Sequence, residues 1–116
     1  MTKPVRLEGV LSWEQLCERV SAGRILELKN ILSLQRGRVT GMSLSRGADE
    51  TRILYVGVKL YEQQGKEWYA LGFPDFDIKI EKDTPRPLTY VDGCIRFVIA
   101  AVDYTIYPVH TPIDCP

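Results

Sequence analysis

The sequence predicts an α+β fold: a mostly antiparallel, twisted sheet of about five to six strands, with one N-terminal amphipathic helix packed on one face. Three observations lead to this fold class. The one clear helical segment comes first, the rest of the chain has the pattern of strands and loops, and no repeat, linker or low-complexity segment divides it. The 116 residues therefore form a single globular domain, residues 1–116, long enough to bury a core without metals or disulfides.

The helix is predicted over residues 13–22. Ser12 is a favourable N-cap, and Gln15 completes a capping box because its side chain can reach back to the amide of Ser12. Gly23 is expected to end the helix in a left-handed conformation. An apolar stripe at helical spacing marks the buried face. The stripe consists of Trp13, Leu16, Cys17 and Val20.

The remaining segments are assigned to strands, although their local sequence signals are weaker than those of the helix. Residues 24–35 combine strand-like parity with good helix formers, and we interpret them as a strand that bends near Asn30. Residues 94–102 are apolar at both parities apart from Arg96, which predicts a central strand covered on both faces. Further strands are expected at residues 38–45 and 74–80, with the tail from residue 103 along an edge or over the surface.

Residues 52–73 predict a β-hairpin with apolar or aromatic side chains on both faces. We favour a three-residue loop, 63–65, because Gly65 supplies positive φ and the resulting register pairs Glu62 with Lys66. One face then belongs to the core. The other is the predicted interaction face, consisting of Tyr55, Lys59, Tyr61, Tyr69, Leu71 and Phe73.

An exposed aromatic face of this kind usually marks a contact site, and tyrosine is frequent in interface cores. The sequence therefore predicts a non-enzymatic interaction module that self-associates or binds a protein partner. A homodimer is the expected assembly, with Tyr61 and Tyr69 in its interface. Two alternatives remain open. Residues 24–35 or the tail cover this face within the chain, or the same aromatics line the apolar cleft of a small-molecule binding domain.

Charge and cysteine content exclude several classes of protein. Fifteen basic and fifteen acidic residues cancel, so neither a nucleic acid nor a membrane is an expected partner. The arginine-rich segment 36–52 is interpreted as a solvated strand-loop-strand edge. The three cysteines (Cys17, Cys94 and Cys115) lack the spacing of a zinc or redox site, and the first residues lack the apolar stretch of a signal peptide. We expect a cytoplasmic protein without a cofactor.

Few residues offer chemistry. His110 is the one histidine and lies between two prolines, where a surface position is favoured over a catalytic one. Asp75 and Asp77 would point the same way from a strand and could hold a hard cation, but no third ligand accompanies them. We therefore expect no metal site and no catalytic constellation.

Overall fold

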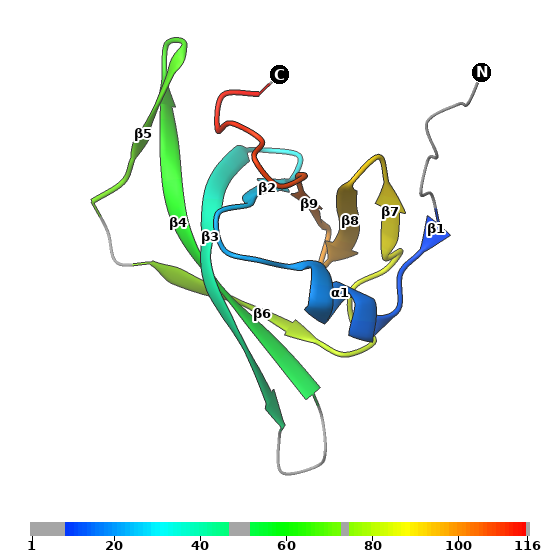
Figure 1. The fold of residues 1–116 in the computed structure, drawn as a ribbon. Helices are drawn as coiled ribbons and strands as arrows, with labels where there is room; N and C mark the ends of the chain where they lie inside the picture. Colours follow the sequence, from blue (N-terminus) through cyan, green and yellow to red (C-terminus); the bar gives the residue numbers. More distant parts are fainter. Residues whose placement is uncertain (1–8, 47–51, 73–74, 116) are drawn as a thin grey trace, which may run out of the picture.

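The computed structural model describes residues 9–46, 52–72 and 75–115 (Figure 1). Its elements are β1 (Gly9–Val10), α1 (Trp13–Arg19), β2 (Ile25–Lys29), β3 (Leu34–Arg46), β4 (Arg52–Gln64), β5 (Glu67–Ala70), β6 (Phe76–Glu81), β7 (Thr89–Val91), β8 (Cys94–Ile99) and β9 (Val102–Ile106). The strands form one antiparallel sheet in the order β1-β7-β8-β9-β2-β3-β4-β5, and β6 also pairs with β4. The sheet is strongly curved, and α1 lies within the curve.

The predicted antiparallel sheet with one helix is confirmed, but the predicted number of strands is wrong. The described residues form nine strands rather than five to six, and the sheet dominates a helix of only seven residues. No helix in these ranges is long and apolar enough to cross a membrane. The core fills the space between α1 and the concave face of the sheet. Its fully buried members include Leu16, Leu26, Val56, Val58, Ile80, Ile95, Phe97 and Ile106.

The start of α1 is confirmed and its end is earlier than predicted. The Ser12 hydroxyl accepts a hydrogen bond from the Gln15 amide at 3.1 Å, and the Gln15 side chain accepts from the Ser12 amide at 2.9 Å. The helix ends at Arg19, and Val20 is already extended. Gly23 is therefore not the helix cap. It has a φ of 90° and its amide donates to the Val39 carbonyl, so that the chain turns into the sheet.

The ambiguous segment 24–35 is a strand followed by a tight turn. The predicted strand is confirmed as β2, but the turn at Asn30 ends it, and β3 begins at Leu34, four residues before the predicted strand. A bulge then interrupts β3: Val39 lies opposite Val58, whereas Gly41 lies opposite Gly57. Such an extra residue bends a strand and increases its twist, which fits the strong curvature of the sheet here.

The prediction of one buried strand over residues 94–102 is wrong. β8 and β9 are joined by a two-residue turn in which Ala100 and Ala101 have φ values of 49° and 64°. Asn-Gly is the usual sequence for such a turn, so two alanines gave no signal that the strand ended. The first part of the predicted surface tail is in fact β9, in the middle of the sheet between β8 and β2. Arg96 of β8 is exposed, so the outer face of this strand is not covered.

Candidate interaction surface

The β4–β5 hairpin has a different register from the predicted one. Its turn contains two residues, Gly65 and Lys66, and Gln64 lies opposite Glu67. Gly65 has a φ of 64°, as the first central residue of a type II′ turn requires. The predicted three-residue loop is therefore wrong. The observed register also keeps Glu62 and Glu67 apart, since Glu62 lies opposite Tyr69 and Glu67 lies opposite Gln64.

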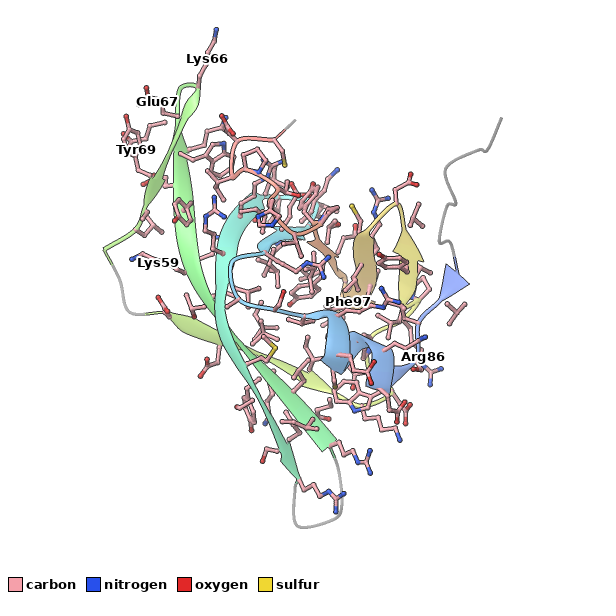
Figure 2. All side chains as sticks on the ribbon, viewed as in Figure 1. Lys59, Lys66, Glu67, Tyr69, Arg86 and Phe97 are labelled. Atoms are coloured by element: carbon pink, nitrogen blue, oxygen red, sulfur yellow. The ribbon has the colours of Figure 1, made fainter. Side chains whose placement is uncertain are left out.

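This register divides the predicted interaction face. Opposed residues of an antiparallel pair share a face, and successive residues alternate. Tyr61 lies opposite Ala70, so Tyr69, which lies opposite Glu62, is on the other face. Figure 2 shows Tyr69 and Glu67 near the end of the projecting hairpin, where the Tyr69 hydroxyl donates to Glu67. Tyr55, Lys59 and Tyr61 remain together on the outer face of β4, and Phe73 lies outside the described residues.

The C-terminal tail covers part of the outer face, and Arg36 holds it there. The Arg36 guanidinium donates to the carbonyls of Ile113, at 2.9 Å, and Cys115, at 2.5 Å, and pairs with Glu27 at 3.1 Å. It lies 5.2 Å from the Trp68 ring centroid, within the range of a cation–π contact. Arg36 is only 6% exposed. The interpretation of this arginine as a solvated edge residue is therefore wrong, because the tail encloses it.

Tyr107 completes this cluster at the start of the tail. Its hydroxyl donates to Glu27 at 2.8 Å, and its ring lies 5.7 Å from the Arg36 guanidinium carbon. Burial and the hydrogen bond to Glu27 raise the pKa of Tyr107 to about 12. For Arg36, burial is the largest single effect and opposes the charge, but the hydrogen bond to Glu27 and the electrostatic effects of Cys115, Glu27 and Tyr107 together outweigh it, so the pKa is raised. The cluster thus stabilises a protonated phenol and a charged guanidinium under the tail.

The stability of the protein is expected to depend on Tyr107 between pH 10 and 12, the ordinary and the raised pKa of this phenol. The contribution is complete below pH 10 and is lost as the pH rises through 12, because folding favours the protonated form. Urea unfolding of the wild type and of Tyr107→Phe over this pH interval tests the prediction. The comparison isolates Tyr107, since the lysines titrate equally in both chains. The wild type should lose stability more steeply, and parallel curves would contradict the assignment.

The turn between β2 and β3 presents two apolar side chains to solvent. Ile31 is 99% exposed and Leu32 is 89% exposed. The turn that carries them is fixed by hydrogen bonds. The Asn30 side-chain oxygen accepts from the amides of Leu32 and Ser33, both at 2.8 Å, and the Asn30 amide donates to the Ser33 carbonyl at 3.0 Å. These contacts involve only Asn30 and backbone groups, so folding of the turn does not explain why its tip is apolar.

A groove of about 630 Å³ adjoins this turn, between the start of β3 and the β4–β5 hairpin. Its lining residues are Ser33, Leu34, Gln35, Tyr61, Glu62, Gln63, Trp68 and Leu71. Tyr61 and Leu71 belong to the predicted interaction face, but Trp68 does not, because the predicted pairing of Glu62 with Lys66 sets Trp68 opposite Leu60, on the core face. Ile31 and Leu32 were not among the predicted site residues, although two adjacent aliphatic residues at a loop tip were a signal. We call Ile31, Leu32, Leu34, Tyr61, Trp68 and Leu71 the apolar end.

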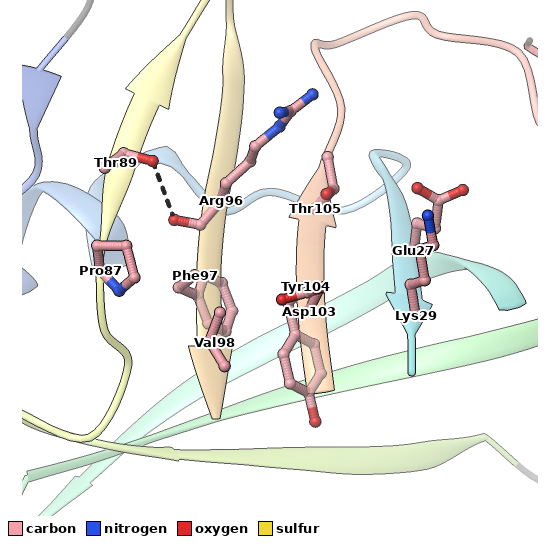
Figure 3. Close-up of a pocket in the computed structure, with 10 residues that line it drawn as sticks. All are labelled: Glu27, Lys29, Pro87, Thr89, Arg96, Phe97, Val98, Asp103, Tyr104 and Thr105. Carbon is pink, nitrogen blue, oxygen red and sulfur yellow. Dashed lines mark hydrogen bonds between the residues drawn. The ribbon is translucent and has the colours of Figure 1, made fainter. Parts of the chain in front are cut away.

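Two other depressions are less suited to a partner. Tyr55 lines a shallow one of about 280 Å³ with Asp77, away from the apolar end. Another, of about 450 Å³, lies on the outer face of β8, β9 and β2 (Figure 3). Its charges balance, since Lys29 and Arg96 accompany Glu27 and Asp103. Glu27 already accepts hydrogen bonds from Arg36 and Tyr107.

The candidate residues for chemistry are not brought together. Asp75, Asp77 and His110 are all exposed. Asp77 lies opposite Gly57 in the sheet, and His110 lies in a turn of the tail with a φ of 69°. Within the described ranges, no three histidine, cysteine, aspartate or glutamate side chains are grouped closely enough to hold a metal ion.

Comparison of the chain with protein-family models, with curated proteins and with solved structures found no match. The geometry of the apolar end is therefore the basis for considering it a contact surface. The apolar end combines an aliphatic turn tip with an adjoining groove that contains two aromatic rings and is also lined by Ser33, Gln35, Glu62 and Gln63. Aromatic and aliphatic groups beside polar ones are the usual composition of a protein contact surface.

Proposed function

We propose that the protein is a non-enzymatic interaction module that binds a protein partner, or a second copy of itself, through the apolar end. The observation that carries this proposal is the exposure of Ile31 and Leu32, at 99% and 89%, on a hydrogen-bonded turn. Adjacent aliphatic side chains held in water are unfavourable unless a partner covers them. The neighbouring groove offers Tyr61 and Trp68, the residue types most enriched among interface hot spots.

The proposal keeps the predicted class of function and changes the surface. Tyr61 and Leu71 remain in it, and Trp68, Leu34 and the turn tip join them. Tyr55 and Lys59 lie on the outer face away from this surface, and Tyr69 lies near the end of the hairpin. The tail supports the same distribution, because it covers the outer face at Arg36 and leaves the turn tip exposed.

Self-association through the apolar end is tested by sedimentation velocity. The double variant Ile31→Asp, Leu32→Asp should keep the fold, because both side chains point into water, and should lose the association made through the apolar end at least tenfold, because two carboxylates would be buried in an apolar contact. Val109→Asp is the matched control, since it charges another exposed aliphatic residue outside the apolar end. Equal association of all three proteins would contradict self-association through this surface.

Small-molecule binding is the second candidate function. A groove of about 630 Å³ has the size of a typical ligand site, and Trp68 and Tyr61 offer stacking surfaces. A ligand bound there should raise the melting temperature of the wild type by mass action and should have no effect on Trp68→Ala. An equal shift in both proteins would place the ligand elsewhere.

A further inference from the structure

The edge of the sheet at β6 carries unpaired backbone groups. β6 pairs with β4 alone among the described strands, with Ile78 opposite Val56 and Ile80 opposite Leu54. The Lys82 amide donates to the Arg52 carbonyl at 2.9 Å, which fixes the even-numbered residues as those whose backbone groups face β4. The N–H and C=O of Asp77 and Lys79 therefore point away from the sheet. Within the part of the chain that the structure describes, they have no backbone partner.

The side chains on this edge are self-complementary. Asp77, Lys79 and Glu81 are exposed on the outer face and alternate in charge. In an antiparallel pairing of two β6 strands about a two-fold axis at Ile78, Asp77 of each copy lies opposite Lys79 of the other. Opposite charges at directly opposed positions stabilise such a pair. Each Asp77–Lys79 pair would also exchange two backbone hydrogen bonds.

Other two-fold registers are less favourable. An axis at Lys79 opposes two lysines and sets Asp77 against Glu81, and an axis at Asp77 opposes two aspartates. An axis at Ile80 matches Lys79 with Glu81, but the Glu81 carbonyl already accepts a hydrogen bond from the Thr84 amide at 3.1 Å. Among pairs formed within β6, the axis at Ile78 alone among these four combines matched charges with free backbone groups; it also sets Asp75, which precedes the strand, opposite Glu81.

We propose that β6 binds β6 of a second copy in this register, joining the two sheets into one. Unpaired strand edges are templates for such addition, and edge charges normally prevent it, but here the charges of the two copies attract. This inference goes beyond the proposed function, because β6 contributes no residue to the apolar end. A dimer through β6 leaves the apolar end available to a partner.

Charge exchange between two variants tests the register. Sedimentation velocity from micromolar to millimolar concentration should show a wild-type dimer that weakens with added salt. Lys79→Glu and Asp77→Lys should each weaken dimerisation at least tenfold, because like charges then oppose each other. An equimolar mixture should restore it, since the aspartate and glutamate of one chain meet the two lysines of the other. A monomeric wild type at millimolar concentration, or no recovery in the mixture, would overturn the proposal.

A backbone variant tests the edge independently. Lys79→Pro removes an N–H that points away from β4, so the β4–β6 ladder keeps its bonds while the second copy loses a donor. Circular dichroism should show a folded protein. Sedimentation of Lys79→Pro combined with Ile31→Asp, Leu32→Asp, which removes any contact through the apolar end, should show a monomer. A folded combined variant that still dimerises would overturn the proposal, and if it does not fold, the charge-exchange mixture decides. The Ile31→Asp, Leu32→Asp protein should still dimerise through β6, which separates this proposal from the proposed function.

Discussion

Replacing Arg24 with alanine is expected to lower the free energy of unfolding by about 3–5 kcal/mol, because three partly buried carbonyls would lose their hydrogen-bond donors. Arg24 is only 6% exposed. Its guanidinium donates to the Tyr107 carbonyl at 2.7 Å, the Arg19 carbonyl at 2.6 Å and the Gly93 carbonyl at 2.9 Å. One side chain thus joins the end of α1, the β7–β8 turn and the start of the tail. Burial lowers the pKa of Arg24, since no carboxylate is among its hydrogen-bond partners.

Arg38→Ala is the matched control for this prediction. Arg38 makes one exposed hydrogen bond, to the Gly23 carbonyl at 3.1 Å, and its loss is expected to cost less than about 1 kcal/mol. Arg24→Lys should recover only part of the stability, because an ammonium group is too compact to reach three carbonyls in the plane that a guanidinium spans. Urea unfolding followed by tryptophan fluorescence measures all three variants. Equal stabilities of Arg24→Ala and Arg38→Ala would show that the three carbonyls need no protein donor.

Gly37→Ala is expected to cost about 2–3 kcal/mol, the upper part of the usual range for overpacking a core. A Cβ atom at this position would lie 2.4 Å from Val58 Cγ1 and 2.7 Å from the Lys59 carbonyl oxygen. Val58 is fully buried, so its side chain has little room to turn, and the carbonyl belongs to the backbone of β4. β3 approaches β4 too closely here for any side chain.

Gly41→Ala, in the same strand, separates this steric effect from the general effect of replacing a glycine. A Cβ atom at Gly41 would meet nothing within 4 Å. The substitution is expected to be neutral or to stabilise by about 0.4–1 kcal/mol, because alanine reduces the entropy of the unfolded chain. Urea unfolding should therefore show a large loss in the free energy of unfolding for Gly37→Ala and no loss for Gly41→Ala. A stable Gly37→Ala protein would mean that the two strands separate there at little cost.

Features determined by neighbouring residues could be predicted from the sequence. Ser12 and Gln15 define the start of α1 because both partners of each capping bond lie within four residues. The hairpin register could not be derived in the same way. Gly65 fits a two-residue turn as well as a three-residue loop, and the choice depends on how far β4 and β5 extend their pairing. That error separated Trp68 from Tyr61 and divided the predicted interaction face.

Two further features depend on contacts between distant parts of the chain. Ala100 and Ala101 adopt positive φ values without glycine or asparagine, so the surrounding strands impose the turn on residues that do not favour it. Arg24 and Arg36 are buried because backbone carbonyls of the tail and of the β7–β8 turn receive their hydrogen bonds. From composition alone, both arginines would be expected at the surface. Every residue has a backbone carbonyl, so the sequence does not show which carbonyls will accept hydrogen bonds from them. The tail's role as a cover for the outer face could not be predicted for the same reason.

The most direct test of the apolar end as a contact surface is site-specific photo-crosslinking in the cells that naturally produce the protein. A photoreactive phenylalanine analogue at Leu32 should capture one protein, either a second copy or a partner of different mass. The same analogue at Val109, also exposed but outside the apolar end, should not capture that protein. Loss of the Leu32 product on adding Ile31→Asp would confirm that the contact depends on the apolar turn. Absence of any product at Leu32, or the same product at both positions, would contradict the proposed function.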